Sequence, residues 1–120
     1  MPRRQEEAVL ELPKRYEVVI PRWKTTGYLL AVTHPVGGPK AKYFESRGYS
    51  ADAPEILEET LREVARTGRV ARKEATNWGA KYLIVGEVIA PDGNPMILGT
   101  VWFVMGDASP TLVTAYPARS

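Results

Sequence analysis

The sequence predicts an α+β fold: two helices followed by an antiparallel β-meander, with the helices packed on one sheet face and an extra strand near the N-terminus. Two observations lead to this prediction. One long amphipathic helix pattern lies in the middle of the chain, and several β-rich segments follow it, separated by turn residues. The 120 residues, 44% apolar and 25% charged, are typical of a single globular domain. We expect that domain over residues 15–117, after an N-terminal arm (1–14) and before a tail (118–120).

The N-terminal half contains only short elements. Residues 5–12 suit either a short helix or a loose arm. The β-branched stretch 15–20 predicts a strand. Residues 27–31 are a short apolar segment before a glycine-rich loop. A short helix is expected over residues 39–47, because a proline suits its first turn and Gly48 suits its C-terminal stop.

A helix over residues 52–67 is the clearest local prediction. Asp52 and Glu55 have the spacing of a capping box at its start, and Gly68 ends it. The apolar residues recur at helical spacing, which predicts one buried stripe formed by Leu57, Leu61, Val64 and Ala65.

The remaining residues predict strands joined by tight turns. The expected strands cover residues 70–76, 81–90, 96–105 and 111–116, with turns at 91–94 and 106–110. The segment Met96 to Met105 is apolar on both faces, whereas a half-exposed antiparallel strand would alternate. We therefore expect this strand to be central and covered on both sides. The second cover would be the N-terminal strand segment or another copy of the chain.

Composition excludes several kinds of chemistry. The chain has no cysteine, which rules out thiol nucleophiles, disulfides and zinc–cysteine sites. Its single histidine, His34, rules out sites built from several histidines, and no carboxylate spacing indicates a metal, so we expect no cofactor. No apolar run approaches membrane-spanning length, and residues 1–7 lack a secretory signal pattern, so we expect a cytoplasmic protein without a membrane partner. Scarce Asn and Gln fit a heat-adapted source, and GC-rich coding would give the same bias.

The net charge is only +2, but the charges are segregated along the chain. Basic side chains are in excess by four in residues 1–47 and again in residues 65–81, whereas acidic side chains are in excess by four in residues 48–64. If the fold brings the two basic segments together, one face will attract phosphate groups. The alternative is a set of separately solvated charged faces.

The loop before the first helix is the most unusual stretch. Gly37 and Gly38 allow close backbone approach, and the helix N-terminus after them offers free N–H groups to an anion. Lys40 and Lys42 add positive charge, and His34 has the right unperturbed pKa for proton transfer. The alternative is a Gly/Pro-rich turn with a turn histidine and two solvated lysines.

Hydroxyl and aromatic side chains alternate on the last two strands. Thr100 and Trp102 share one face of their strand, and so do Thr114 and Tyr116 on the next. Paired hydroxyls near a cation are able to hold a phosphate, and Trp or Tyr is able to stack on a base. The alternative is a cross-strand threonine contact among core aromatics.

Three segments together resemble a known family. They are residues 34–44 (HPVGGPKAKYF), 99–103 (GTVWF) and 110–117 (PTLVTAYP). The family that they resemble consists of small bacterial domains of unknown function, found as stand-alone proteins and at the C-termini of polymorphic contact-dependent toxins. The match covers residues 27–117 and leaves the N-terminal arm outside.

This resemblance implies a ribonuclease fold of the barnase/EndoU/colicin/RelE type. Such enzymes place a His or Lys, a second cation and hydroxyl residues on a sheet face. There they position the RNA 2′-hydroxyl for attack on the adjacent phosphate without a metal. The implied roles are proton transfer for His34, phosphate charge for Lys40, phosphate hydrogen bonds for Thr100 and Thr114, and base stacking or support for Trp102 or Tyr116. A second catalytic histidine is missing from this chain.

The implied partners are RNA and a small antitoxin or immunity protein, which would make the chain a ribonuclease-like toxin. The alternative is a non-catalytic binding module or homodimeric partner protein. The doubly apolar segment Met96 to Met105 and the lack of a strong catalytic motif favour that alternative.

Overall fold

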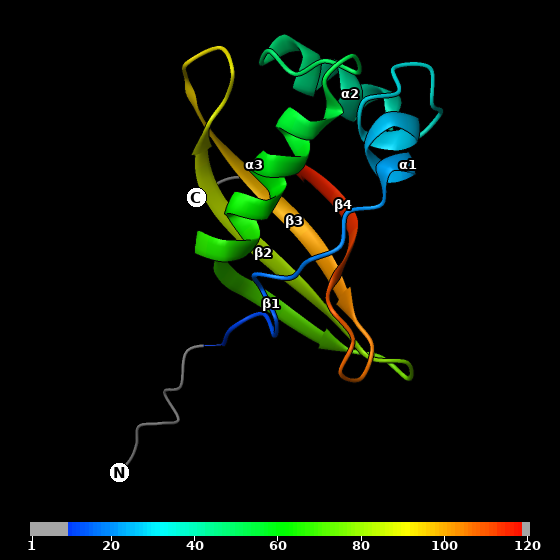
Figure 1. The fold of residues 1–120 in the computed structure, drawn as a ribbon, viewed down its shortest axis with the longest axis vertical. Coiled ribbons are helices and arrows are strands. Elements are labelled where there is room, and N and C mark those ends of the chain that lie inside the picture. The colour runs from blue at the N-terminus through cyan, green and yellow to red at the C-terminus, as the bar shows by residue number, and fades with distance from the viewer. Residues whose placement is uncertain (1–9, 119–120) are drawn as a thin grey trace.

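The computed structural model describes residues 10–118 and confirms the α+β fold (Figure 1). The strands form an antiparallel meander in the order β1-β2-β3-β4. Residues 1–9, which hold most of the expected arm, and residues 119–120 lie outside the described part of the chain. The elements are α1 (Arg22–Lys24), which continues into the π-helical turn η2 (Thr25–Leu29), α2 (Gly38–Ser46), α3 (Pro54–Thr67), β1 (Arg69–Ala75), β2 (Ala80–Ile89), β3 (Pro95–Val104) and β4 (Thr111–Pro117).

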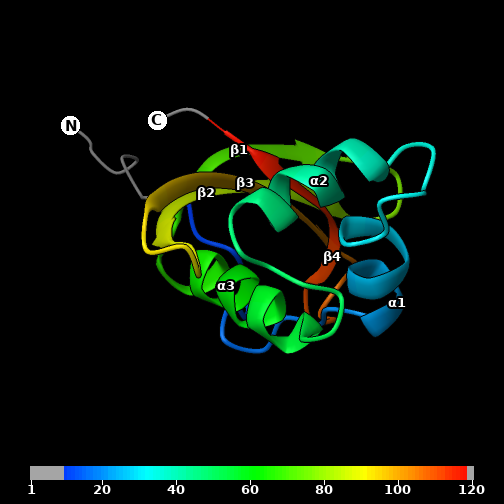
Figure 2. The ribbon, with the colours of Figure 1, turned by 90° about the horizontal axis from the view of Figure 1, so that it is seen from above.

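Helix α3 packs on one side of the sheet, as its amphipathic pattern predicts (Figure 2). Leu57, Leu61 and Val64 are completely buried against the strands. The predicted capping box is wrong, because Ala53 is the N-cap residue and no side chain caps the helix. Asp52 lies in the turn before the helix instead, where its backbone amide donates a hydrogen bond to the Ser50 hydroxyl at 3.0 Å.

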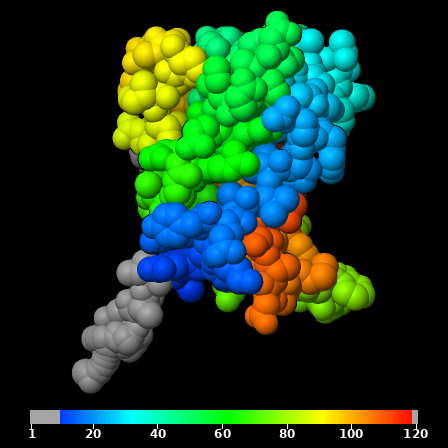
Figure 3. Space-filling model, in the orientation of Figure 1, coloured from blue at the N-terminus to red at the C-terminus, as the bar shows by residue number. Residues whose placement is uncertain are grey.

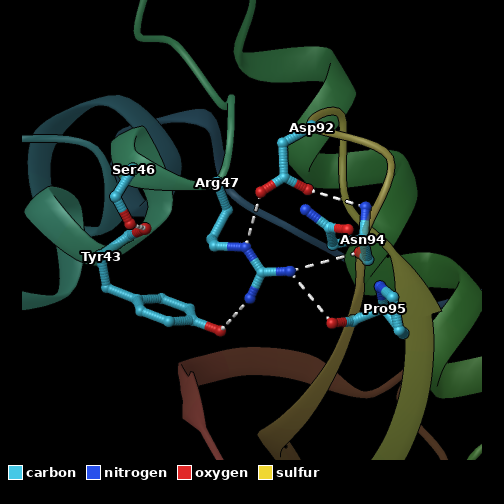
Figure 4. Close-up of polar contacts among 6 residues, drawn as sticks. All are labelled: Tyr43, Ser46, Arg47, Asp92, Asn94 and Pro95. Atoms are coloured by element: carbon cyan, nitrogen blue, oxygen red, sulfur yellow. Dashed lines mark hydrogen bonds and ion pairs between the residues drawn. The ribbon is translucent and has the colours of Figure 1, made fainter.

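Helix α2 lies at the end of the sheet and is fastened there by Arg47, which follows it (Figure 4). The Arg47 guanidinium donates to Asp92 at 2.9 Å, to the Tyr43 hydroxyl at 3.2 Å, and to the backbone oxygens of Asn94 and Pro95. The Asn94 amide and then Arg47 lower the pKa of Asp92, so its carboxylate stays ionised. These bonds fix α2 to the β2–β3 hairpin. Gly48 stops the helix as predicted, with φ of 101°.

The N-terminal segment joins the sheet at one point rather than along a full strand. Val19 makes an isolated parallel bridge with Thr111 of β4. Its amide donates to the Pro110 oxygen at 2.8 Å, and its oxygen accepts from Leu112 at 3.0 Å. Leu12 and Ile20, on either side of this segment, are buried in the core that α3 shares.

Strand β3 is an inner strand, as predicted, but residues 10–118 close only one of its faces. Met96, Leu98 and Trp102 point to the helices and are buried. Ile97 and Phe103 point the other way and are half-exposed. The N-terminal segment does not cover this second face, because its buried side chains join the core on the helix side. We call the uncovered side of the sheet the open face.

Among residues 10–118, no helix is both long enough and apolar enough to cross a membrane.

Candidate functional site

The strand register places polar and apolar side chains in rows across the open face. Arg72 of β1 lies beside Leu83 of β2, which lies beside Val101 of β3 and then Thr114 of β4. Neighbouring strands are about 4.8 Å apart, so this row spans about 14 Å from the cation to the hydroxyl. Its centre is apolar and its two ends are polar.

The rows on either side complete a shallow groove. Tyr116 of β4 pairs with Gly99 of β3. A Cβ atom on Gly99 would lie 2.8 Å from the Tyr116 ring, so the ring occupies the space that a side chain at position 99 would need. Lys81 of β2 lies in the opposite row, beside Glu74. The groove has a volume of about 350 Å³ and is lined by Arg72, Glu74, Lys81, Tyr82, Leu83, Val101, Val113, Thr114 and Tyr116.

At the β4 edge of this groove, Lys40 binds two hydroxyl groups. Its ammonium donates to the Tyr28 phenol oxygen at 2.8 Å and to the Thr114 hydroxyl at 2.9 Å. All three side chains are partly exposed. With His34, which packs against Tyr28, they form what we call the Lys40 cluster. Thr114 directly follows a β-bulge in β4, a distortion that often re-aims a side chain beside an active site.

The π-helical turn positions Tyr28. The Leu30 amide donates to the Thr25 oxygen five residues earlier, at 2.8 Å. Such π-helical turns are rare in proteins, and those that occur often lie at functional sites. The turn is anchored through α1, where Arg22 makes a two-point ion pair with the buried Glu58 of α3. Lys24 also lies 5.3 Å from the Tyr28 ring, so two ammonium groups flank the phenol.

This environment changes the acidity of Tyr28. The hydrogen bond from Lys40 lowers the pKa of the phenol below its ordinary value, and the Thr114 hydroxyl acts in the same direction. Burial, in contrast, raises the pKa of Tyr49 in the core. Tyr28 is therefore better suited to proton transfer than an ordinary tyrosine.

We expect an absorbance titration to detect this phenol directly. Tyr28 should ionise at lower pH than Tyr49, and Lys40→Met should move that early step to higher pH because the ammonium that favours the phenolate is gone. Lys42→Met, which removes an exposed ammonium of the same helix, serves as the control. Identical titration curves for wild type and Lys40→Met would contradict the assignment.

His34 closes the loop before α2. Its Nδ1 accepts hydrogen bonds from the amides of Val36 at 3.0 Å and Gly37 at 2.9 Å, so the ring proton lies on Nε2. The ring packs edge-on against Tyr28, with centroids 5.1 Å apart. The Gly38 amide donates to the backbone oxygen of His34 at 2.8 Å, so the amides of Val36, Gly37 and Gly38 are all bonded within the loop and are not free to bind an anion.

The two glycines of this loop are needed for close packing. Gly37 and Gly38 are buried, and a side chain on either would collide with a backbone oxygen, that of Tyr28 or Val32 respectively. Lys42, in contrast, is exposed on α2. None of these three residues lines the groove.

Thr100 and Trp102 lie on the opposite side of the sheet from Thr114. Both are completely buried. The Trp102 indole donates to the Thr100 hydroxyl at 2.8 Å, and this hydroxyl donates to the Ile84 oxygen at 3.1 Å. Sealed in the core in this way, neither side chain is able to contact a substrate, and we leave both out of the proposed site.

The effect of Thr100→Val should therefore be on stability. Valine has the same shape but leaves the buried indole N–H without an acceptor, which costs about 1–3 kcal/mol of unfolding free energy. Urea unfolding followed by tryptophan fluorescence measures this loss. Any enzymatic activity per folded molecule should stay at the wild-type level, and an activity loss without destabilisation would return Thr100 to the site.

The structure thus brings together His34, Lys40, Thr114 and Tyr116, and adds Tyr28, which the sequence did not single out. From the sequence, residues 27–31 were predicted only as a short apolar segment before the loop, with no role for their phenol. Both basic segments reach this region, since Arg72 and Lys81 line the groove and Lys40 bounds it. Within residues 10–118, no group of three or more His, Cys, Asp or Glu side chains is placed to hold a metal ion.

Comparison with known proteins adds two findings. A family model described as a domain of unknown function (DUF6883) matches residues 11–119. A solved structure described as a contact-dependent growth inhibition toxin–immunity protein complex from Klebsiella pneumoniae 342 is similar, with a TM-score of 0.68 and 17% sequence identity, over 83% of this chain and 99% of that chain. At this identity the similarity shows a shared fold. No curated protein is detectably similar in sequence.

Proposed function

This chain belongs to the DUF6883 family, a domain of unknown function, and from that premise we propose that it is a toxin-like enzyme that cleaves RNA phosphodiesters without a metal ion. The observation that carries the proposal is the Lys40 ammonium, held between the Tyr28 and Thr114 hydroxyls at the edge of a groove. The shared fold with a chain of a toxin–immunity complex supports the toxin-like part.

The cluster has the groups that phosphate transfer within RNA requires. The attacking 2′-oxygen forms a bond to phosphorus as the bond to the 5′-oxygen breaks, which leaves a 2′,3′-cyclic phosphate and a 5′-hydroxyl. Negative charge grows on the phosphate oxygens in the transition state. Lys40 supplies a positive charge to these oxygens, and the Thr114 hydroxyl supplies a hydrogen bond.

Tyr28 is the proton acceptor in this proposal. Its phenolate, which Lys40 stabilises, takes the proton of the 2′-hydroxyl, and the leaving 5′-oxygen takes a proton from water. Cleavage should then accelerate as pH rises through the pKa of Tyr28, because only the deprotonated phenol acts as a base. We assign His34 a positioning role, since its Nδ1 is already bonded to the loop amides and its ring supports Tyr28.

The groove suits an RNA strand beside the cluster. Tyr116 is placed to stack with a base, and the half-exposed Leu83 and Val101 form an apolar floor for it. Arg72 and Lys81 are placed to attract neighbouring phosphates. An antitoxin or immunity protein would neutralise such an enzyme most simply by covering the open face.

A second candidate is non-catalytic binding through the same face, including a homodimer. It is favoured by the half-exposed Ile97, Val101 and Phe103, which the described residues leave uncovered. Light scattering tests whether the protein forms a homodimer. A protein that stays monomeric at high concentration does not use the open face to self-associate.

Cleavage of total RNA and of tRNA in the presence of a chelator tests the proposed activity. Wild type should cleave, and both Lys40→Ala and His34→Ala should cleave less, the first by losing a charge and the second by releasing Tyr28. If folded wild type leaves the RNA intact, or if both variants cleave as well as wild type, the proposal is wrong.

A further inference from the structure

The sheet has an unpaired edge at the end opposite the β1–β2 turn. Strand β1 pairs with β2 only as far as Val85, while β2 continues to Ile89 (Figure 1). The Ala90 amide donates to the Asn94 oxygen at 2.9 Å. Because hydrogen-bonded pairs alternate along an antiparallel ladder, Val88 faces β3 and the backbone groups of Glu87 and Ile89 face the other side. Among residues 10–118, no strand lies there.

Helix α3 runs beside this edge, and the space between them is a groove. It has a volume of about 620 Å³ and is lined by α3 on one side and by Glu87, Val88 and Ile89 on the other. A second hollow of about 350 Å³, at the start of β1, shares Glu87 with it. Figure 3 shows the side on which α3 lies next to the β2–β3 hairpin. We call this combined feature the edge groove.

The side chains of the edge groove are mainly apolar and acidic, with Arg69 at the start of β1 as a basic residue of the second hollow. Ile56 is 48% exposed and Ile89 is 65% exposed, which is unusual for isoleucine at both borders of one groove. The acidic residues are Glu55, Glu59, Glu63 and Glu87. Arg66 contacts two of them, Glu59 at 2.8 Å and Glu63 at 3.0 Å, and leaves the groove with a net negative charge. The open face near Arg72, in contrast, carries positive charge.

We propose that the edge groove binds an extended segment of a partner protein that carries Lys or Arg, by adding a strand to Glu87–Ile89. Strand addition requires backbone groups that are free at a sheet edge, which Glu87–Ile89 offer because β1 ends at the level of Val85, and the alternation of side chains provides the specificity. The side of the added strand that faces α3 would meet its glutamates and Ile56, and apolar residues on the other side of the added strand would meet Ile89.

A second copy of this chain is the weaker occupant. The unpaired edge is only about four residues or 13 Å long, and a stable dimer needs an interface of standard size. The site is also independent of the Lys40 cluster, because it lies on β2 whereas the cluster lies at the β4 edge of the sheet. It therefore stands or fails separately from the proposed RNA cleavage.

Amide NMR with short synthetic peptides tests the edge groove. The probes are an alternating Lys/Val peptide, an alternating Glu/Val peptide, and the Lys/Val peptide with alternate backbone nitrogens methylated. We expect the first to shift the amide signals of Glu87 and Ile89 and to slow their hydrogen exchange at least about tenfold. The other two should not, since one reverses the charge and the other lacks the backbone donors.

Variants of exposed groove residues sharpen the test. Glu87→Gln and Glu59→Gln should each weaken the binding of the Lys/Val peptide. Glu45→Gln, which removes an exposed carboxylate of α2, should leave this binding unchanged. Equal binding of the Glu/Val peptide, or signals that move only on the open face, would overturn the proposal. A dimer that Ile89→Lys dissociates would assign the groove to a second copy, and would also overturn it.

Discussion

Lys40→Met is expected to lower RNA cleavage at least about a hundredfold, because methionine keeps the apolar stem of the side chain but removes the positive charge that bridges Tyr28 and Thr114. The loss should appear in kcat more than in KM, since the ammonium stabilises charge that develops in the transition state. Cleavage of a short fluorescent RNA under single-turnover conditions gives both quantities.

Lys42→Met is the matched control for this substitution. It removes the same charge from the same helix, two residues further on, where the side chain is exposed and lines no groove. We expect the Lys42→Met variant to cleave RNA at a rate within a few-fold of the wild-type rate. If the two variants lose the same activity, the general charge of α2 matters and the Lys40 cluster has no special role.

Trp102→Ala is expected to have the largest effect on stability. The indole is completely buried between the sheet and the helices, and large-to-small substitutions of this kind cost about 3–5 kcal/mol. The free energy of unfolding of a domain of this size is typically only about 5–15 kcal/mol, so the variant should reach its unfolding midpoint at a much lower urea concentration than wild type. Urea denaturation followed by circular dichroism measures the change.

Trp23→Ala provides the comparison for that loss. Trp23 in α1 is 64% exposed, and the ammonium of Lys24 lies 4.6 Å from the centroid of its ring. Its removal should change the free energy of unfolding by less than about 1 kcal/mol. A Trp102→Ala protein as stable as Trp23→Ala would mean that the sheet and helices do not pack around the indole.

Local patterns predicted most of the fold because they reflect local physics. The stripe of α3 repeats every three to four residues, and Gly48 adopts the positive φ that its position after a helix requires. The capping box failed for a local reason as well. The Ser50 hydroxyl accepts a hydrogen bond from the Asp52 amide in the turn before the helix, and the helix then starts at Pro54 without a side-chain cap.

The two threonines show what the sequence left open. Thr100 pairs with Ala115, and Thr114 pairs with Val101, so their side chains point to opposite sides of the sheet. A strand with one polar face reveals its orientation, but β3 is apolar on both faces and does not. The same ambiguity suggested a second cover over β3 that the N-terminal segment does not provide.

Tyr28 was missed because its position depends on long-range packing. The π-helical turn that carries it is a rare conformation, and the local sequence pattern did not indicate it. Its hydroxyl meets Lys40 twelve residues away, and Lys40 meets Thr114 seventy-four residues away. Only the fold brings these three groups within hydrogen-bond distance.

The most direct test of the central claim compares an RNA oligonucleotide with its 2′-O-methyl counterpart of the same sequence, each mixed with wild-type protein in a chelator. If the Lys40 cluster cleaves RNA through its 2′-hydroxyl, the unmodified strand is cut to products that end in a 2′,3′-cyclic phosphate, and the methylated strand stays intact. Intact RNA, or equal cleavage of both strands, would contradict the proposed activity.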